Sequence, residues 1–295
     1  MFYIYVFLTT IIFSFIGVLN KAAGLMVSPD IIAFARFFFG ACFLAVYALI
    51  KRKKISLSLI GKLLWIGGSA KALNYITENY GIARGFSFGN IIVWPVQCVI
   101  TLLFSIIILK EKLNKRSIIG AVLCVIGIGV VTWNGVPPEN FFGPNFSLTL
   151  LFVISGTGAA VFLIAIKLLG SKMEAGESNL SMFVIGSMIT FLPIPFTAEI
   201  KTEFHLISIT ALLLLGLITG AGFMIVAKVM ERIPLFLATI LQSANVIFTL
   251  LWAIIFYNDP VTVYIASGTL IFLAGMVLIN IRLPGKTRRE KSGEK

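Results

Sequence analysis

The chain has 295 residues, of which 59% are hydrophobic and only 12% are charged, with a formal net charge of +12. A soluble domain typically carries about 25% charged residues, so this composition excludes a water-soluble globule and predicts a chain that lies mostly in hydrocarbon. The basic residues stand in short clusters between apolar runs, which is typical of cytoplasmic loops and not of a nucleic-acid-binding face.

Ten apolar runs follow one another along the chain, and each is near the length of one membrane crossing, which takes about 20 residues. Breaks that contain proline, glycine or charged residues separate them. The first run has no basic segment before it, so we interpret it as a retained helix and not as a cleaved signal peptide. The sequence therefore predicts an all-α membrane protein with ten transmembrane helices. They cover 2–20, 31–50, 59–80, 87–109, 116–133, 147–169, 179–198, 206–227, 234–256 and 261–281.

The distribution of basic residues predicts the orientation of these helices. With a cytoplasmic N-terminus, 19 of the 24 lysines and arginines fall on the cytoplasmic side, whereas Lys21, Arg84 and Lys201 fall outside. Cytoplasmic loops of membrane proteins carry such an excess. We expect a multi-pass protein of the inner or plasma membrane with both termini in the cytoplasm.

The second and third runs contain charged residues, which are costly within a bilayer. Arg36 lies about one and a half turns inside the second run, where it can extend to the membrane surface, pair with another side chain or contact a solute. Lys71 lies near the middle of the third run, and Asn74, Tyr75 and Glu78 share its helix face. This face either lines a solute cavity or neutralises itself through a Lys71–Glu78 contact. Glu78 is the only carboxylate within a predicted span, so it is the candidate coupling site for a proton or another cation.

The fourth and ninth runs each carry amide side chains. Asn90, Trp94 and Gln97 have the spacing of one helix face, and Gln242 and Asn245 lie in the ninth run. Such amides either bind a solute or bond helices to one another. Together with Arg36 and the polar face of the third run, they make up the predicted substrate-binding set.

The two halves of the sequence repeat each other at an offset of 148 residues. At this offset Gly120 coincides with Gly268, and Gly127 coincides with Gly275. Because each half contains five spans, which is an odd number, the second half must insert in the inverted orientation. Inverted repeats are typical of transporters that bind a solute between their halves. The predicted units are the first repeat over 1–148, the second repeat over 149–281 and a basic cytoplasmic tail over 282–295.

The positions of some polar and small residues indicate a structural role. Glu111 and Asp259 coincide at the repeat offset, and each precedes a predicted helix. We expect both to cap helices, because Asp259 is followed by Pro260 and proline suits the first helical position. Gly216 and Gly220 have the four-residue spacing that is typical of closely packed helices.

Residues for metal or covalent chemistry are sparse. Cys42, Cys98 and Cys124 fall inside apolar runs without the spacing of metal ligands, and His205 is the only histidine. The sequence also contains no phosphate-binding loop, which excludes an ATP-driven pump formed by this chain alone, and no convergent set of nucleophile, base and metal ligands. These features predict that the protein has no metal site, no cofactor and no enzymatic activity.

Short motifs occur in a fixed order over nearly the whole chain. They are Arg36-Phe37, Pro95, Glu111-Lys112-Leu113, Gly120 and Gly127 in the first half, and Ile233-Pro234, Asp259, Gly268 and Gly275 in the second. This ordered set resembles the EamA family of the drug/metabolite transporter superfamily. The chain departs from the family pattern at Ser243, which stands where the first half has Pro95, and at Asp259, which replaces the usual glutamate. The resemblance implies a ten-helix, alternating-access carrier of metabolites.

The predicted function is that of a secondary carrier that exports or exchanges a small polar metabolite. The predicted site offers a cation, an anion, several amides and two aromatic rings. This mixture suits a zwitterion such as an amino acid better than a phosphorylated sugar, which calls for several basic residues. The alternatives are a small organic cation bound by Glu78 and aromatic faces and, from another class, a membrane-embedded enzyme or lipid flippase. The expected partners are the solute and the lipid bilayer, with a proton as the candidate coupling ion and no nucleic acid.

Overall fold

The computed structural model describes residues 2–52, 57–85, 92–108, 115–133, 135, 144–201, 203–231, 235, 242 and 245–280. Within these ranges the regular elements are helices, no β-strand occurs, and an isolated backbone bridge joins Val27 to Ile200. This confirms the predicted all-α class.

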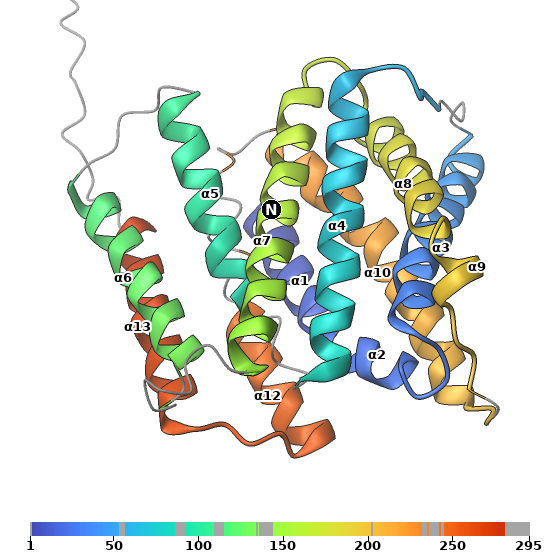
Figure 1. Ribbon diagram of the computed structural model, residues 1–295. Coiled ribbons are helices and arrows are strands. Elements are labelled where there is room, and N and C mark those ends of the chain that lie inside the picture. Colours follow the sequence, from blue (N-terminus) through green and yellow to red (C-terminus); the bar gives the residue numbers. More distant parts are fainter. Residues whose placement is uncertain are drawn as a thin grey trace, which may run out of the picture.

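The helices of the first half follow the predicted spans closely. α3 begins at Pro29, after an extended Ser28, and has Asp30 in its first turn. This start is favourable because proline presets the helical φ angle and a carboxylate suits the positive end of the helix. The first predicted span is divided at Phe15. The helices are α1 (Phe2–Ser14), α2 (Ile16–Ala23), α3 (Pro29–Ile50), α4 (Lys62–Arg84), α5 (Val93–Ile107) and α6 (Lys115–Trp133) (Figure 1).

The second half also follows the predicted spans. Its second span is divided where Pro193 precedes a short helix, because a proline inside a helix removes a backbone hydrogen bond. The helices are α7 (Pro144–Leu169), α8 (Ala175–Phe191), α9 (Ile194–Thr197), α10 (Leu206–Met230), α12 (Asn245–Tyr257) and α13 (Val263–Asn280).

Four segments of the described chain are both long and apolar enough to cross a membrane. They are Pro29–Ile50, Phe146–Leu169, Ala175–Thr197 and Leu206–Met230. The other predicted spans correspond to shorter apolar helices and to α4, which has 23 residues but carries several polar side chains. The ten-span topology therefore remains a prediction beyond these four segments.

Helices of the two halves pack in pairs that the sequence repeat relates to one another. α3 packs on α10 and α8 packs on α4, and the repeat exchanges these two contacts. α3 also packs on its equivalent α8, and α6 packs on its equivalent α13 at one edge of the molecule (Figure 1). Two repeats inserted in opposite orientations produce this kind of pairing.

The glycines that coincide in the repeat bring α6 and α13 together. A Cβ atom on Gly127 would lie 2.6 Å from the carbonyl oxygen of Gly268, and a Cβ on Gly275 would lie 2.6 Å from that of Gly120. The two contacts are equivalents of each other, because the repeat maps Gly120 to Gly268 and Gly127 to Gly275. Small residues allow this close approach of two helix backbones.

The glycines of α10 have the packing role that their spacing predicts. A Cβ on Gly220 would lie 2.8 Å from the carbonyl oxygen of Gly40 in α3, and a Cβ on Gly216 would collide with Phe39. The absence of side chains at both positions lets α3 and α10 pack closely.

Asp259 does not cap α13, so this expectation is wrong. The Thr262 hydroxyl accepts the backbone N–H of Ile265 at 3.2 Å, which is the arrangement of a helix cap. The Asp259 carboxylate instead pairs with Lys21 at 3.1 Å and ties α2 to the segment between α12 and α13. Glu111, the repeat equivalent of Asp259, lies outside the described residues.

Candidate functional site

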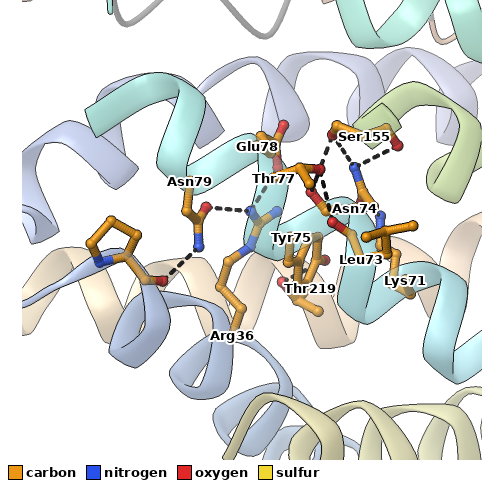
Figure 2. Close-up of polar contacts among 11 residues, drawn as sticks. Arg36, Lys71, Leu73, Asn74, Tyr75, Thr77, Glu78, Asn79, Ser155 and Thr219 are labelled. Atoms are coloured by element: carbon orange, nitrogen blue, oxygen red, sulfur yellow. Dashed lines mark hydrogen bonds and ion pairs between the residues drawn. The ribbon is translucent and has the colours of Figure 1, made fainter. Parts of the chain in front are cut away.

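Arg36 is buried inside the bundle and does not extend to the membrane surface. Its side chain is 1% exposed, and one guanidinium nitrogen lies 2.9 Å from the Glu78 carboxylate and 3.4 Å from the Asn79 amide oxygen. The guanidinium carbon lies 3.5 Å from the centroid of the Tyr75 ring. Of the three alternatives for Arg36, the structure therefore shows pairing with another side chain. This ion pair with Glu78 joins α3 to α4 (Figure 2).

The partner of Glu78 is not Lys71, which was one of the two alternatives for this helix face. The carboxylate pairs with Arg36 from another helix and not with Lys71 on its own face. Glu78 is also not the only buried carboxylate, because Asp30 in the first turn of α3 accepts hydrogen bonds of 2.8 Å from Tyr80 and from Thr197. The predicted span began at residue 31, whereas α3 begins at Pro29, and this difference excluded Asp30 from the prediction.

Lys71 lies in a buried, largely aromatic environment. Its ammonium donates to the Asn74 amide oxygen at 2.7 Å. It lies 4.3 Å from the ring centroid of Phe223, 4.4 Å from that of Tyr75 and 5.2 Å from that of Phe162. The side chain is buried, as its depth in the predicted span required.

The polar face of α4 bonds to helices of the second half. Asn74 donates to the hydroxyl of Ser155 at 2.6 Å and to its carbonyl oxygen at 3.1 Å, which joins α4 to α7. The Tyr75 hydroxyl shares a hydrogen bond of 3.2 Å with the Thr219 hydroxyl of α10. Figure 2 shows Lys71 and Ser155 on one side of Tyr75 and Arg36 on the other. The sequence-predicted residues of α4 therefore meet at a boundary between the two halves.

The cluster around Tyr75 contains two cations and one carboxylate. Arg36 is paired with Glu78, while the neighbours of the Lys71 ammonium are an amide oxygen and three ring faces. A buried charge requires a partner or a polar environment. The arrangement therefore favours the approach of a negatively charged group to Lys71.

The described amide residues of the fourth and ninth runs are Gln97, Gln242 and Asn245, and all three are buried. Asn245 donates to the Thr10 carbonyl at 3.3 Å and accepts from Thr249 at 2.7 Å, so it bonds helices together. The Nε2 atoms of Gln97 and Gln242 have no hydrogen-bond partner in the described part of the chain. Buried polar atoms are normally partnered, so these two remain candidates for solute contact. Asn90 lies outside the described residues.

Trp94 is buried, and its ring lies 6.3 Å from that of Phe13 in α1. Phe13 in turn lies 4.9 Å from Phe223, one of the rings that surround Lys71. This aromatic series brings the predicted cavity residue Trp94 into contact with the cluster through residues that the sequence did not single out.

A cavity of about 250 Å³ lies apart from the cluster, between the ends of α7 and α10. Lys167, Ser171 and Glu231 are among the residues that line it, and Lys167 donates to the Met230 carbonyl at 2.6 Å. None of its lining residues belongs to the predicted substrate-binding set. No group of three or more His, Cys, Asp and Glu side chains that could hold a metal ion occurs among the residues that the structure describes.

Among the comparisons with known proteins, one shows the family of the chain and another shows its fold. The sequence model of the EamA-like transporter family matches residues 1–133 and again residues 147–281. No curated protein matches the chain significantly. A solved structure described as "Crystal structure of protein" superposes with a TM-score of 0.72 over 95% of this chain and 97% of that chain, at 15% sequence identity, and this likeness shows the fold. The family match covers both halves, and the chain therefore belongs to the EamA-like transporter family.

Proposed function

We propose that the protein is a secondary, alternating-access carrier that exports or exchanges a small metabolite bearing a carboxylate, and that a zwitterion such as an amino acid fits best. Membership of a transporter family supports the transport role. The observation that carries the substrate class is the buried cluster of Arg36, Lys71 and Glu78 around Tyr75, which holds one more cation than carboxylate. In this proposal the carboxylate of the substrate pairs with Lys71.

The composition of the cluster supports a single carboxylate over a phosphate. Phosphate is bound most tightly by several charged donors, often including a bidentate arginine. Here the Arg36 guanidinium already lies 2.9 Å from Glu78. Lys71 is then the cation left to meet an anion, and one ammonium suits the charge of one carboxylate.

A small organic cation is the rival substrate. It would bind at Glu78 and on aromatic faces. To reach Glu78, an amine would have to displace the Arg36 guanidinium from a buried ion pair. This competition makes the cation less favourable, and an amine without a carboxylate is therefore the contrasting probe in the test.

The position of the cluster supports alternating access. Arg36, Lys71 and Tyr75 belong to the first half, and the hydrogen bonds from Asn74 to Ser155 and between Tyr75 and Thr219 cross to the second. In inverted-repeat carriers, one half moves against the other around a site between them. A solute at Lys71 would contact the helices that such a movement displaces.

The test is a thermal-unfolding screen of the purified protein with amino acids, amines, nucleosides and sugar phosphates. A ligand that binds the folded protein raises its unfolding temperature by mass action. We expect carboxylate-bearing solutes to stabilise the wild type and the control Lys62→Met, in which an exposed lysine of the same helix is removed. They should not stabilise Lys71→Met. Stabilisation by amines without a carboxylate, or an unchanged response of Lys71→Met, would contradict the proposal.

A further inference from the structure

The ammonium of Lys71 is enclosed by aromatic rings that come largely from the other half of the protein. Phe162 belongs to α7 and Phe223 to α10, whereas Lys71 and Tyr75 belong to α4. The three rings lie between 4.3 and 5.2 Å from the Lys71 Nζ atom. A cation over a ring face is attracted by the negative face of the ring, and the attraction is largest where water is excluded. The faces of the three rings therefore stabilise the ammonium in the way that a neighbouring anion would.

The three rings restrict the access of a carboxylate to Lys71 while they keep these positions. A charge-assisted N–H···O bond is about 2.7–2.9 Å long, so the incoming oxygens need space close to Nζ. Asn74 occupies one donor direction at 2.7 Å, and the rings cover other directions. A ring that moves aside would give the carboxylate oxygens this space.

Phe223 packs on Phe13, Phe162 and Phe183, but its partial exposure and its lack of a hydrogen bond make it the ring of the three that is least fixed. Tyr75 is fixed by its hydrogen bond to Thr219 and by the Arg36 guanidinium above its ring. Phe162 is completely buried and lies farther from Lys71. Phe223 is 7% exposed, lies nearest to the ammonium and, as a hydrocarbon side chain, forms no hydrogen bond that would hold it.

A movement of Phe223 would be passed on to α1. Phe223 lies 4.9 Å from Phe13, and the ring of Phe13 packs so closely on Gly222 that a Cβ there would collide with it. Phe13 also lies 6.3 Å from Trp94 in α5. The series of contacts from Lys71 through Phe223 and Phe13 to Trp94 thus joins the Lys71 ammonium to α1 and α5. These two helices carry no charged residue of the cluster.

We propose that Phe223 is the side chain that a substrate carboxylate displaces from Lys71, so that it sets the affinity of the site and passes the presence of substrate on to Phe13. This inference rests on the proposed function, because it requires a carboxylate ligand. In the empty carrier the ring of Phe223 is the competitor of that ligand. Removing the ring therefore strengthens carboxylate binding, which is the opposite of what the loss of an ordinary packing contact would do.

The test compares Phe223→Leu with Phe183→Leu. Phe183 is completely buried and packs 6.3 Å from Phe223 and 6.4 Å from Phe162, but it makes no cation–π contact with Lys71 among the described residues. Glycine and acetate are the probes, and their apparent affinities are measured by thermal-shift titration. We expect Phe223→Leu to bind them about two- to thirty-fold more tightly than the wild type, the range of a cation–π contact. Phe183→Leu should match the wild type. Unchanged or weaker binding by Phe223→Leu overturns the inference.

A second measurement needs no substrate and separates the two proposals. A small amine-selective reagent is applied to the empty protein, and the labelling of Lys71 is measured by mass spectrometry relative to the exposed Lys62. Lys71 should be labelled faster in Phe223→Leu than in the wild type or Phe183→Leu, and equal labelling contradicts the role of Phe223. If labelling rises but neither glycine nor acetate binds any variant, the enclosure of Lys71 by Phe223 is supported and the proposed carboxylate substrate fails. If the wild type binds them but Phe223→Leu changes neither binding nor labelling, the proposed function stands and the role of Phe223 fails.

Discussion

The ion pair between Arg36 and Glu78 makes the burial of each residue possible. Both side chains are more than nine-tenths buried, and their charged atoms lie 2.9 Å apart. A buried pair contributes little net stability, because desolvation offsets most of the attraction, but removing one partner leaves an uncompensated charge.

Arg36→Gln should therefore lower the free energy of unfolding by about 3–5 kcal/mol, measured by denaturant unfolding in detergent. The double variant Arg36→Gln/Glu78→Gln should recover part of this loss, because it leaves no buried charge unpaired. The control is Arg84→Gln, which removes an exposed arginine of α4. A loss as small as that of the control would show that Arg36 and Glu78 do not depend on each other.

Glu78 remains the proposed coupling site for a proton, and its pairing with Arg36 adds a condition. In this proposal a movement of α3 against α4 separates Glu78 from Arg36 during the transport cycle. Glu78→Gln should retain exchange of solute across proteoliposomes but lose accumulation driven by a pH gradient, since the amide carries no proton. Accumulation at the wild-type level would return Glu78 to a structural role.

The contacts within the candidate site were predictable only between residues that share one helix. Lys71, Asn74, Tyr75 and Glu78 were identified from their spacing, because helix geometry places them on one face. The partner of Glu78 was not identified, because Arg36 lies 42 residues away on another helix. Phe162 and Phe223 carried no signal, because they are two of 26 phenylalanines and nothing in their spacing distinguishes a ring at the cluster from one that faces lipid.

The contact between α6 and α13 shows how repeated elements meet. The sequence identified the glycines as equivalent positions, but the offset alone does not reveal which pairs touch. In the structure Gly127 lies against Gly268, with a Phe272 backbone atom 2.7 Å from the position of a Cβ. Backbone atoms cannot rotate away as a side chain does, so this contact has little room to adjust.

Gly127→Ala should lower the free energy of unfolding by about 1–3 kcal/mol through overpacking. Gly129→Ala is a matched control two residues along the same helix, because a Cβ there meets no atom within 4 Å. The control should be neutral or stabilising, since alanine favours a helix by up to about 1 kcal/mol relative to glycine. Equal stabilities of the two variants, measured by thermal unfolding in detergent, would exclude close packing at Gly127.

The positions of most helices followed from the apolar runs, and the breaks within them followed less well. The interruption at Pro193 coincides with a proline, which is a sequence signal for a break in a helix. The interruption at Phe15 has neither proline nor glycine at that residue, and its backbone remains near the helical region. Tertiary packing decides such a break, and a hydropathy pattern does not contain that information.

At the scale of the molecule, the orientation in the membrane is still a prediction from charge. The 19 basic residues assigned to the cytoplasmic side against three outside predict that both termini are cytoplasmic. A C-terminal fluorescent reporter that folds only in the cytoplasm should be bright, and a C-terminal phosphatase that works only outside should be inactive. The reverse pattern would contradict the predicted orientation and would place every loop on the opposite side of the membrane.

The inverted orientation of the second half is a prediction from the repeat, because an odd number of spans per half leaves only inverted insertion. The all-helical structure and the contacts exchanged between α3·α10 and α8·α4 agree with this reasoning. The chemical identity of the substrate was not predictable at this scale, because carriers with one architecture differ in the few side chains at the boundary of their halves.

The most direct test of the proposed carrier function is a counterflow measurement in proteoliposomes, because it combines transport with the proposed role of Lys71. Vesicles are loaded with an unlabelled amino acid that stabilises the purified protein, and uptake of the labelled amino acid is followed over time. We expect transient uptake by the wild type and by Lys62→Met, and loss of uptake by Lys71→Met with the fold retained. Uptake by Lys71→Met at the wild-type rate, or uptake by the wild type of amines but of no carboxylate-bearing solute, would contradict the proposed function.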